Sequence, residues 1–167
     1  MLFRQLYEDE LRFREHLRTA TSLPVGLMAL LGGALAYLAR GVRVQNDFVS
    51  WGFLTALAAA VYYFLRTAYF LIRGYHGYTY QRIPSPAQLK RYRDELREYY
   101  VSIGEPPERA ASEFAEFLDA RYCEAAEKNT YANLAKSENL FRATSALVYC
   151  LILAALCVPF LILTLRS

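Results

Sequence analysis

The chain has few of the residues that build most active sites. Its 167 residues include two histidines, His16 and His76, and neither has a carboxylate or cysteine partner at a useful spacing. No glycine-rich stretch has a phosphate-binding pattern, and no group of residues has the spacing of metal ligands. The sequence therefore predicts no enzyme, no metal site and no cofactor.

Cysteine is also scarce. Cys123 stands alone, while Cys150 and Cys157 are seven residues apart in an apolar stretch, which places them on one face of a helix. Three scattered cysteines favour a reduced, structural role over disulfides or metal binding.

Strand signals are missing as well. No stretch alternates between polar and apolar residues for long enough to form a sheet, and there are no internal repeats or low-complexity segments. The sequence predicts an all-α protein.

Charge is absent from three long stretches. Residues 19–39 (21 residues), 48–65 (18) and 143–165 (23) contain no Asp, Glu, Lys or Arg. A membrane-spanning helix needs about 20 mostly apolar residues. We therefore expect an integral membrane protein with three transmembrane helices.

These stretches divide the chain into four predicted segments. They are an N-terminal amphipathic helix at 1–22, a transmembrane hairpin at 23–73, a helical region at 74–142, and a transmembrane helix at 143–167. Eleven Lys or Arg fall between residues 73 and 142, whereas Arg166 alone follows the third span. The positive-inside rule then puts the N-terminus and residues 74–142 in the cytoplasm, and the 40–47 loop and the C-terminus outside.

Helix boundaries in the predicted cytoplasmic region are well marked. Ser85, followed by Pro86 and Gln88, forms a capping-box pattern that begins a helix, and Gly104 ends it. Pro106 and Pro107 then open another helix. Because residues 108–158 contain neither Gly nor Pro, this helix is expected to run into the third span.

Polar and small residues form stripes in the first two spans. Polar side chains in a membrane face protein or water, so the polar stripe of the second span predicts an oligomer around a central axis. Small residues in the first span let helices approach closely. Ordinary packing within one chain is the alternative for both stripes. The pore-lining candidates are Thr55, Tyr62 and Arg66, and the helix-packing candidates are Gly26, Ala29 and Gly33.

The charges outside the spans are segregated. Residues 82–97 are mainly basic, and residues 105–127 hold seven acidic side chains and two arginines. One interpretation is that these stretches pair within or between subunits. The other is that a basic patch stays open for an anionic ligand, because Arg beside Tyr suits phosphates and stacked bases. The ligand-binding candidates are Lys90, Arg91, Arg93, Arg97 and Lys136.

A stripe of amides precedes the third span. Tyr122, Asn129, Asn133 and Lys136 fall within about 60° of one another on a helix. Asn is a poor residue for a helix interior, so two of them need partners. We expect a buried amide ladder at a subunit interface or around a ligand, the interface being favoured because amides set register between packed helices. With Arg142, the candidates for gating or interface contacts are Tyr122, Asn129 and Asn133.

The layout resembles the small membrane effectors of bacterial conflict systems, the SLATT class, and among them the transmembrane effector of the Hailong anti-phage system. The resemblance is carried by the charged helix "FRQLYEDELRFREHLR", two close spans with helices after them, and the stripe "EKNTYANLAKSENLFRA". The third span departs from the two-span pattern of that class.

The resemblance implies a homo-oligomer, for example a tetramer, that forms an ion-conducting pore in the bacterial inner membrane. Opening it would collapse the ion gradient of an infected cell. It further implies control by a nucleotide or short DNA ligand, made by a nucleotidyltransferase encoded nearby. The alternative to a pore-forming effector is a non-conducting membrane scaffold that docks a soluble partner. A small transporter is disfavoured because no span is broken at mid-depth.

Overall fold

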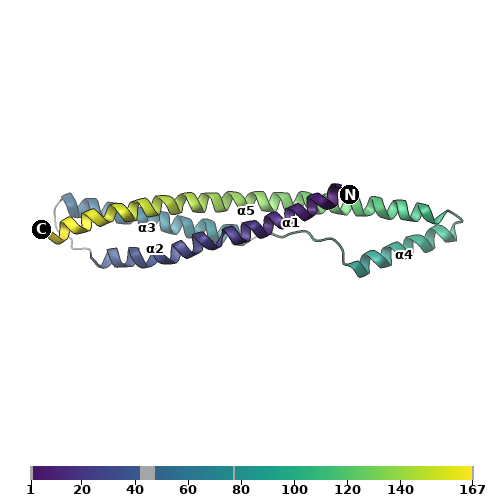
Figure 1. The fold of residues 1–167 in the computed structure, drawn as a ribbon, viewed down its shortest axis with the longest axis horizontal. Coiled ribbons are helices and arrows are strands. Elements are labelled where there is room, and N and C mark those ends of the chain that lie inside the picture. Colours follow the sequence, from purple (N-terminus) through teal and green to yellow (C-terminus); the bar gives the residue numbers. More distant parts are fainter. Residues whose placement is uncertain (1, 42–47, 77, 167) are drawn as a thin grey trace. The chain divides into compact units, whose positions relative to one another are not determined.

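The described part of the chain is entirely helical. A computed structural model describes residues 2–41, 48–76 and 78–166, and these contain helices and no strand (Figure 1). The helices are α1 (Leu2–Ala20), α2 (Ser22–Arg40), α3 (Phe48–Tyr75), α4 (Pro86–Ser102) and α5 (Pro107–Arg166). The predicted all-α class is confirmed. Residues 42–47 of the predicted outer loop lie outside the described residues.

Three stretches of the described chain are long and apolar enough to cross a membrane. They are Leu2–Arg40, which joins α1 and α2, then Phe48–Tyr75, and finally Pro107–Leu163. Three candidate membrane spans are therefore present, as the charge-free runs predict.

The helix boundaries follow local sequence signals. Ser85 accepts a hydrogen bond from the backbone N–H of Gln88, whose side chain accepts from the Ser85 N–H, so the predicted capping box is formed. Gly104 has a φ of 77°, a conformation that costs glycine little, and it follows the end of α4. The second predicted helix is one continuous helix of 60 residues, α5.

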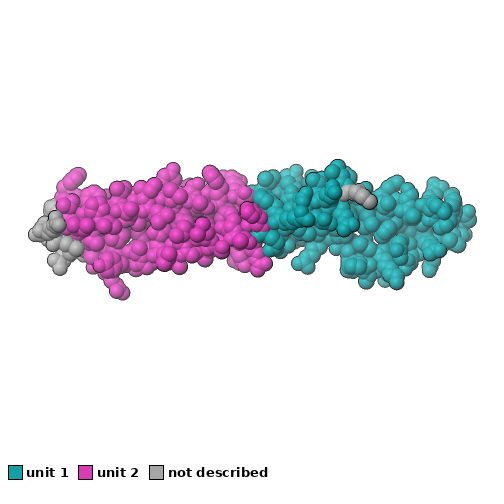
Figure 2. Space-filling model, in the orientation of Figure 1, with its two compact units in different colours: residues 1–15, 79–134 teal, residues 16–78, 135–167 magenta. Residues whose placement is uncertain are grey.

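The chain forms two compact units, which Figure 2 shows in teal and magenta. Unit 1 combines residues 1–15 with 79–134, and unit 2 combines residues 16–78 with 135–167. Unit 1 thus brings the start of the N-terminal helix together with most of the predicted cytoplasmic region. Unit 2 contains the apolar stretches.

Unit 2 has a core made by three helices. The core residues are Leu31, Leu35 and Leu38 of α2, Phe53, Leu57 and Ala60 of α3, and Leu147, Cys150, Ala154 and Cys157 of α5. The two cysteines are fully buried and free, and the Cys150 thiol donates to the Ala60 carbonyl at 3.3 Å. Their predicted position on one packed face is confirmed. Each of the three apolar helices therefore buries one face against the other two.

Unit 1 packs through aromatic rings and polar contacts. Tyr92 of α4 lies 4.5 Å from Phe117 and 6.3 Å from Phe114 of α5, measured between ring centroids. The Tyr100 hydroxyl bonds to the Glu113 carboxylate, which raises the pKa of Tyr100. The contacts between α4 and the start of α5 therefore combine an apolar stripe with a polar end.

The orientation in the membrane gives the first prediction. In a Cys123→Ser background, Ser112→Cys places an exposed thiol on α5 in unit 1. Because the positive-residue bias puts this region inside, a membrane-impermeant maleimide should not label it in intact cells, but should label it after permeabilisation. Asn46→Cys, in the predicted outer loop, is the control that should be labelled in intact cells. Labelling of residue 112 without permeabilisation would contradict the orientation.

Candidate functional site

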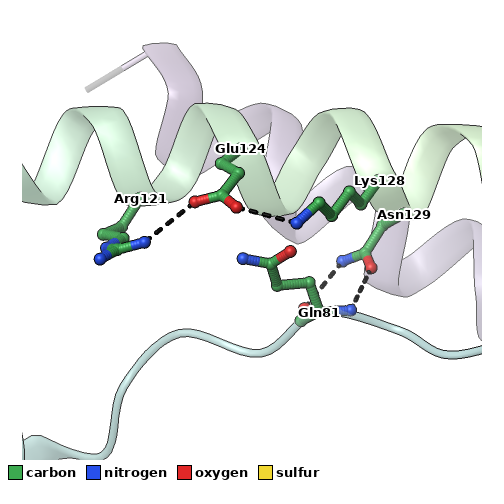
Figure 3. Close-up of polar contacts among 5 residues, drawn as sticks. All are labelled: Gln81, Arg121, Glu124, Lys128 and Asn129. Atoms are coloured by element: carbon green, nitrogen blue, oxygen red, sulfur yellow. Dashed lines mark hydrogen bonds and ion pairs between the residues drawn. The ribbon is translucent and has the colours of Figure 1, made fainter.

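The amide stripe on α5 is buried in unit 1. Asn129 is 0% exposed and Asn133 is 1% exposed, although α5 carries charged residues on either side of them. Asn129 accepts a hydrogen bond from the Gln81 backbone N–H at 2.9 Å and donates to the Gln81 carbonyl at 3.3 Å (Figure 3). The side-chain amide of Asn129 thus binds both backbone groups of Gln81, before α4, with the pair of hydrogen bonds that a neighbouring β-strand would make.

Asn133 joins three parts of unit 1. Its amide oxygen accepts from the Tyr80 hydroxyl at 2.7 Å, and its nitrogen donates to the Glu10 carbonyl at 2.9 Å and to the Glu10 carboxylate at 2.7 Å. The other carboxylate oxygen of Glu10 accepts from the Thr130 hydroxyl at 2.8 Å. We call Glu10, Tyr80, Gln81, Asn129, Thr130 and Asn133 the amide clasp.

The clasp confirms one expectation. The two asparagines are buried, as their unfavourable position in a helix predicts. Within the chain, the hydrogen-bonding atoms of both side chains are satisfied by α1 and by residues 80 and 81. A role of this stripe at a subunit interface or around a ligand stays a prediction.

A charged group lies beside the clasp. The Glu124 carboxylate accepts from Lys128 at 2.8 Å and from Arg121 at 3.0 Å (Figure 3). Hydrogen bonds from Lys128, Gln81 and Arg121 lower the pKa of Glu124 from 4.5 to about 2. Its contribution to folding is therefore present above about pH 4.5 and is lost as the pH falls toward 2.

Tyr122 is part of the same packing. Its ring meets the Tyr7 ring of α1 edge-on, with centroids 5.8 Å apart. The Arg14 guanidinium of α1 lies 4.5 Å from the centroid of the Tyr80 ring. The start of α1 is thus held on α5 by an aromatic pair and the clasp, and on the chain before α4 by a cation–π contact.

The basic residues predicted to bind a ligand do not all lie in one place. Arg93, Asp94 and Arg97 of α4 line an open groove of about 410 Å³, which also contains Phe114 of α5. The Asp94 carboxylate accepts from Arg93 at 3.3 Å, so Arg97 is the arginine of this groove that has no ion pair among the described residues. Arg91 is bound to Glu95 at 2.7 Å, which raises the pKa of Arg91, and Lys90 is exposed on α4 outside this lining. We call this feature the α4–α5 groove. It brings two guanidinium groups and an aromatic ring to one place.

Two candidates near the spans belong to unit 2. Lys136 lies beside α3, where its carbonyl oxygen would be 3.9 Å from a Cβ added at Gly74. Arg142 is exposed, bonds to Glu138 one turn earlier, and lies 5.8 Å from the centroid of the Phe70 ring. Lys136 therefore belongs to a different unit from Lys90, Arg91, Arg93 and Arg97.

The polar stripe of the second span faces away from the unit 2 core. Thr55, Tyr62 and Arg66 are all exposed on α3, and Tyr62 keeps 59% of its surface. The Thr55 hydroxyl donates to the Trp51 carbonyl at 2.9 Å, so it is satisfied by its own helix. The opposite face of α3 carries Phe53 and Leu57, which are buried. The polar stripe of the second span therefore lies opposite the packed face of α3.

The small-residue stripe of the first span is open. Gly26, Ala29 and Gly33 are exposed, and a Cβ added at Gly26 or Gly33 would meet no described atom of another helix within 4 Å. Close packing inside the chain uses Gly32 instead, where an added Cβ would lie 3.4 Å from the Phe64 ring. Gly26 and Gly33 of this stripe therefore make no close helix contact within the described part of the chain. Its outward position leaves it available to another helix.

The residues that sequence spacing did not identify are the hydrogen-bond partners of the two asparagines. Glu10 lies 123 residues before Asn133, and Gln81 lies 48 before Asn129. No spacing rule relates residues so far apart, so the asparagines carried the only sequence signal.

Comparison of the chain with known protein families, with curated proteins and with solved structures gives no match. The resemblance to conflict-system effectors thus rests on the sequence features given above, and it stays a prediction.

Proposed function

We propose that this protein assembles from several copies into an ion-conducting pore in the bacterial inner membrane. An anionic nucleotide or short DNA ligand, bound in the α4–α5 groove, controls its opening. In this proposal the pore is an effector of anti-phage defence that dissipates the ion gradient, and a nucleotidyltransferase encoded nearby supplies the ligand.

The observation that carries the proposal is the pair of open faces on unit 2. Three apolar helices already share one core, yet the α3 face with Thr55 and Tyr62 and the α2 face with Gly26 and Gly33 remain uncovered. In a membrane, polar side chains are found facing protein or water, and small residues mark helix contacts. Further copies of the same chain supply both kinds of surroundings. The faces with small residues pack against one another, and the polar faces surround a central axis.

The groove supports control by an anion. Guanidinium groups bind phosphates in a bidentate manner, and an aromatic ring provides a stacking surface for a base. Arg93, Arg97 and Phe114 present these two chemistries together. The clasp connects α1 to α5 within the same unit. A change in the position of α5 would therefore be passed on to α1.

Conductance in planar bilayers tests the pore. We expect the purified protein to give unitary currents, and Tyr62→Ala to change their size by about twofold or more, since the side chains around a pore set its width and polarity. Leu65→Ala is the matched control, because Leu65 is also exposed on α3 (61%) but lies off the polar stripe. Assembly is checked by Gly33→Cys, whose Cβ would have open space around it among the described residues and whose thiol should crosslink between copies.

The outcomes separate the pore from a scaffold. A crosslinked, folded oligomer that conducts no current would contradict the pore and favour a non-conducting scaffold for a soluble partner. Equal currents from Tyr62→Ala and the parent protein would move the pathway away from the Thr55–Tyr62 face.

A further inference from the structure

A second groove lies in unit 2, between α3 and α5. It has a volume of about 230 Å³ and is open on one side. Its lining consists of Ala146 and of Arg66, Arg142, Ser145 and the rings of Tyr63, Phe141 and Tyr149. The pore proposal uses none of its α5 residues.

The groove is level with the ends of two apolar segments. The charge-free run in α3 ends directly before Arg66, and the run in α5 begins directly after Arg142. Tyr63 and Tyr149 connect the two helices at this level, with ring centroids 5.2 Å apart. Tyrosine and arginine at the end of a span are typical of the depth at which lipid headgroups lie.

The groove carries excess positive charge. The Arg66 and Arg142 guanidiniums lie 5.7 and 5.8 Å from the centroid of the same ring, Phe70. Arg142 is bonded to Glu138, whereas the contacts of Arg66 among the described residues are with the rings of Tyr63 and Phe70 and include no ion pair. A singly charged anion between the two arginines would balance the excess.

The groove continues into an apolar surface. Residues 145, 149, 152 and 156 follow one another at helical spacing on one face of α5. Ile152 is 51% exposed and Leu156 is 50% exposed, both farther along the span than Ser145 and Tyr149. A molecule with an anionic head and a long apolar tail matches this order of polar and apolar groups.

We propose that the α3–α5 groove binds an anionic phospholipid such as phosphatidylglycerol. Arg66 and Arg142 hold the phosphodiester, Ser145 and the two tyrosines surround it, and an acyl chain lies along Ile152 and Leu156. Basic pockets between membrane helices bind lipid headgroups in this way. The inference does not depend on the pore proposal being correct, but it assigns Arg66, one of the pore-lining candidates, to a lipid rather than to the pore axis.

Lipid binding is tested on the purified full chain in detergent. Dioleoyl phosphatidylglycerol, dioleoyl phosphatidylcholine and inorganic phosphate are added separately, and native mass spectrometry and the thermal unfolding midpoint are recorded. Only phosphatidylglycerol should remain bound and raise the midpoint, because binding to the folded state stabilises it. Arg66→Gln and Arg142→Gln should each weaken phosphatidylglycerol binding by about tenfold, as expected for loss of one charged hydrogen-bonding group.

Arg73→Gln is the matched control. Arg73 is exposed near the same end of α3 and bonds to the Tyr69 hydroxyl at 3.0 Å, but it does not line the groove. Its loss should change phosphatidylglycerol binding less than about twofold if the groove, rather than general attraction, holds the lipid.

Three results would overturn the inference. Equal weakening by Arg66→Gln and Arg73→Gln would show general electrostatic attraction. An equal effect of inorganic phosphate would identify a solute anion site instead of a lipid site. Unchanged phosphatidylglycerol binding in both Arg66→Gln and Arg142→Gln, with altered unitary current in Arg66→Gln, would return Arg66 to the pore. Arg66→Lys keeps the charge, so it serves if the glutamine variant does not fold.

Discussion

Replacing Asn129 and Asn133 together by leucine should destabilise unit 1 by about 2–4 kcal/mol, because each partner of the two amides loses a buried hydrogen bond. These partners are the backbone of Gln81, the Tyr80 hydroxyl and the carbonyl and carboxylate of Glu10. Exchanging buried polar groups for apolar groups of similar size is neutral or stabilising only where both members of a hydrogen-bonded pair are replaced. Here the partners lie elsewhere in the chain and are not replaced.

Amide hydrogen exchange measures this effect where it occurs. In the double variant, loss of Asn129 removes the acceptor of the Gln81 N–H, and loss of Asn133 removes the bonds to Glu10. Exchange at Gln81 and in α1 up to residue 15 should therefore become faster. Core amides of α3 in unit 2 should keep the exchange rates of the parent protein. Glu127→Leu, an exposed substitution two residues before Asn129, is the control that should leave all of these rates unchanged.

Glu10 provides a graded version of the same test. Glu10→Gln keeps an oxygen that can accept from Thr130 or Asn133, whereas Glu10→Leu keeps only the backbone carbonyl. The leucine variant should therefore lose more stability than the glutamine variant. If the double leucine variant and Glu10→Leu both exchange as slowly as the parent, the clasp does not hold α1 on α5.

Replacing Arg93 and Arg97 together by glutamine should remove most of the affinity for a short anionic ligand. The probe is a fluorescein-labelled single-stranded DNA oligomer, and its binding is measured by anisotropy over a range of salt concentrations. Each lost phosphate contact should reduce the slope of log affinity against log salt by about 0.7. The double variant should therefore bind more weakly at low salt and show a slope about 1.4 smaller in magnitude.

Two further variants locate the ligand in the α4–α5 groove. Lys90→Gln removes a positive charge from the same helix without changing the groove lining, so its effect should be small. Phe114→Leu should weaken binding by about 1–3 kcal/mol, the value of one stacked base, and leave the salt slope unchanged. Equal losses in Lys90→Gln and the double arginine variant would show attraction to the whole basic helix and would exclude the groove as the site.

The sequence by itself determined the features that depend on neighbouring residues. The capping box at Ser85 and Gln88 and the left-handed Gly104 are local, and both occur as predicted. The three apolar stretches depend on composition over about 20 residues, and they too are present. The burial of Asn129 and Asn133 followed from their spacing and from the poor fit of Asn in an exposed helix.

Only the tertiary structure decided which groups these residues contact. Almost every side chain of α2 is apolar, so its periodicity does not distinguish the packed face with Leu31 and Leu35 from the open face with Gly26 and Gly33. Glu10 meets Asn133 across 123 residues of sequence, a pairing that arises when α1 packs on α5. Local signals arise from short-range backbone and side-chain energetics, whereas the choice of partner depends on which helix faces the packed unit brings together.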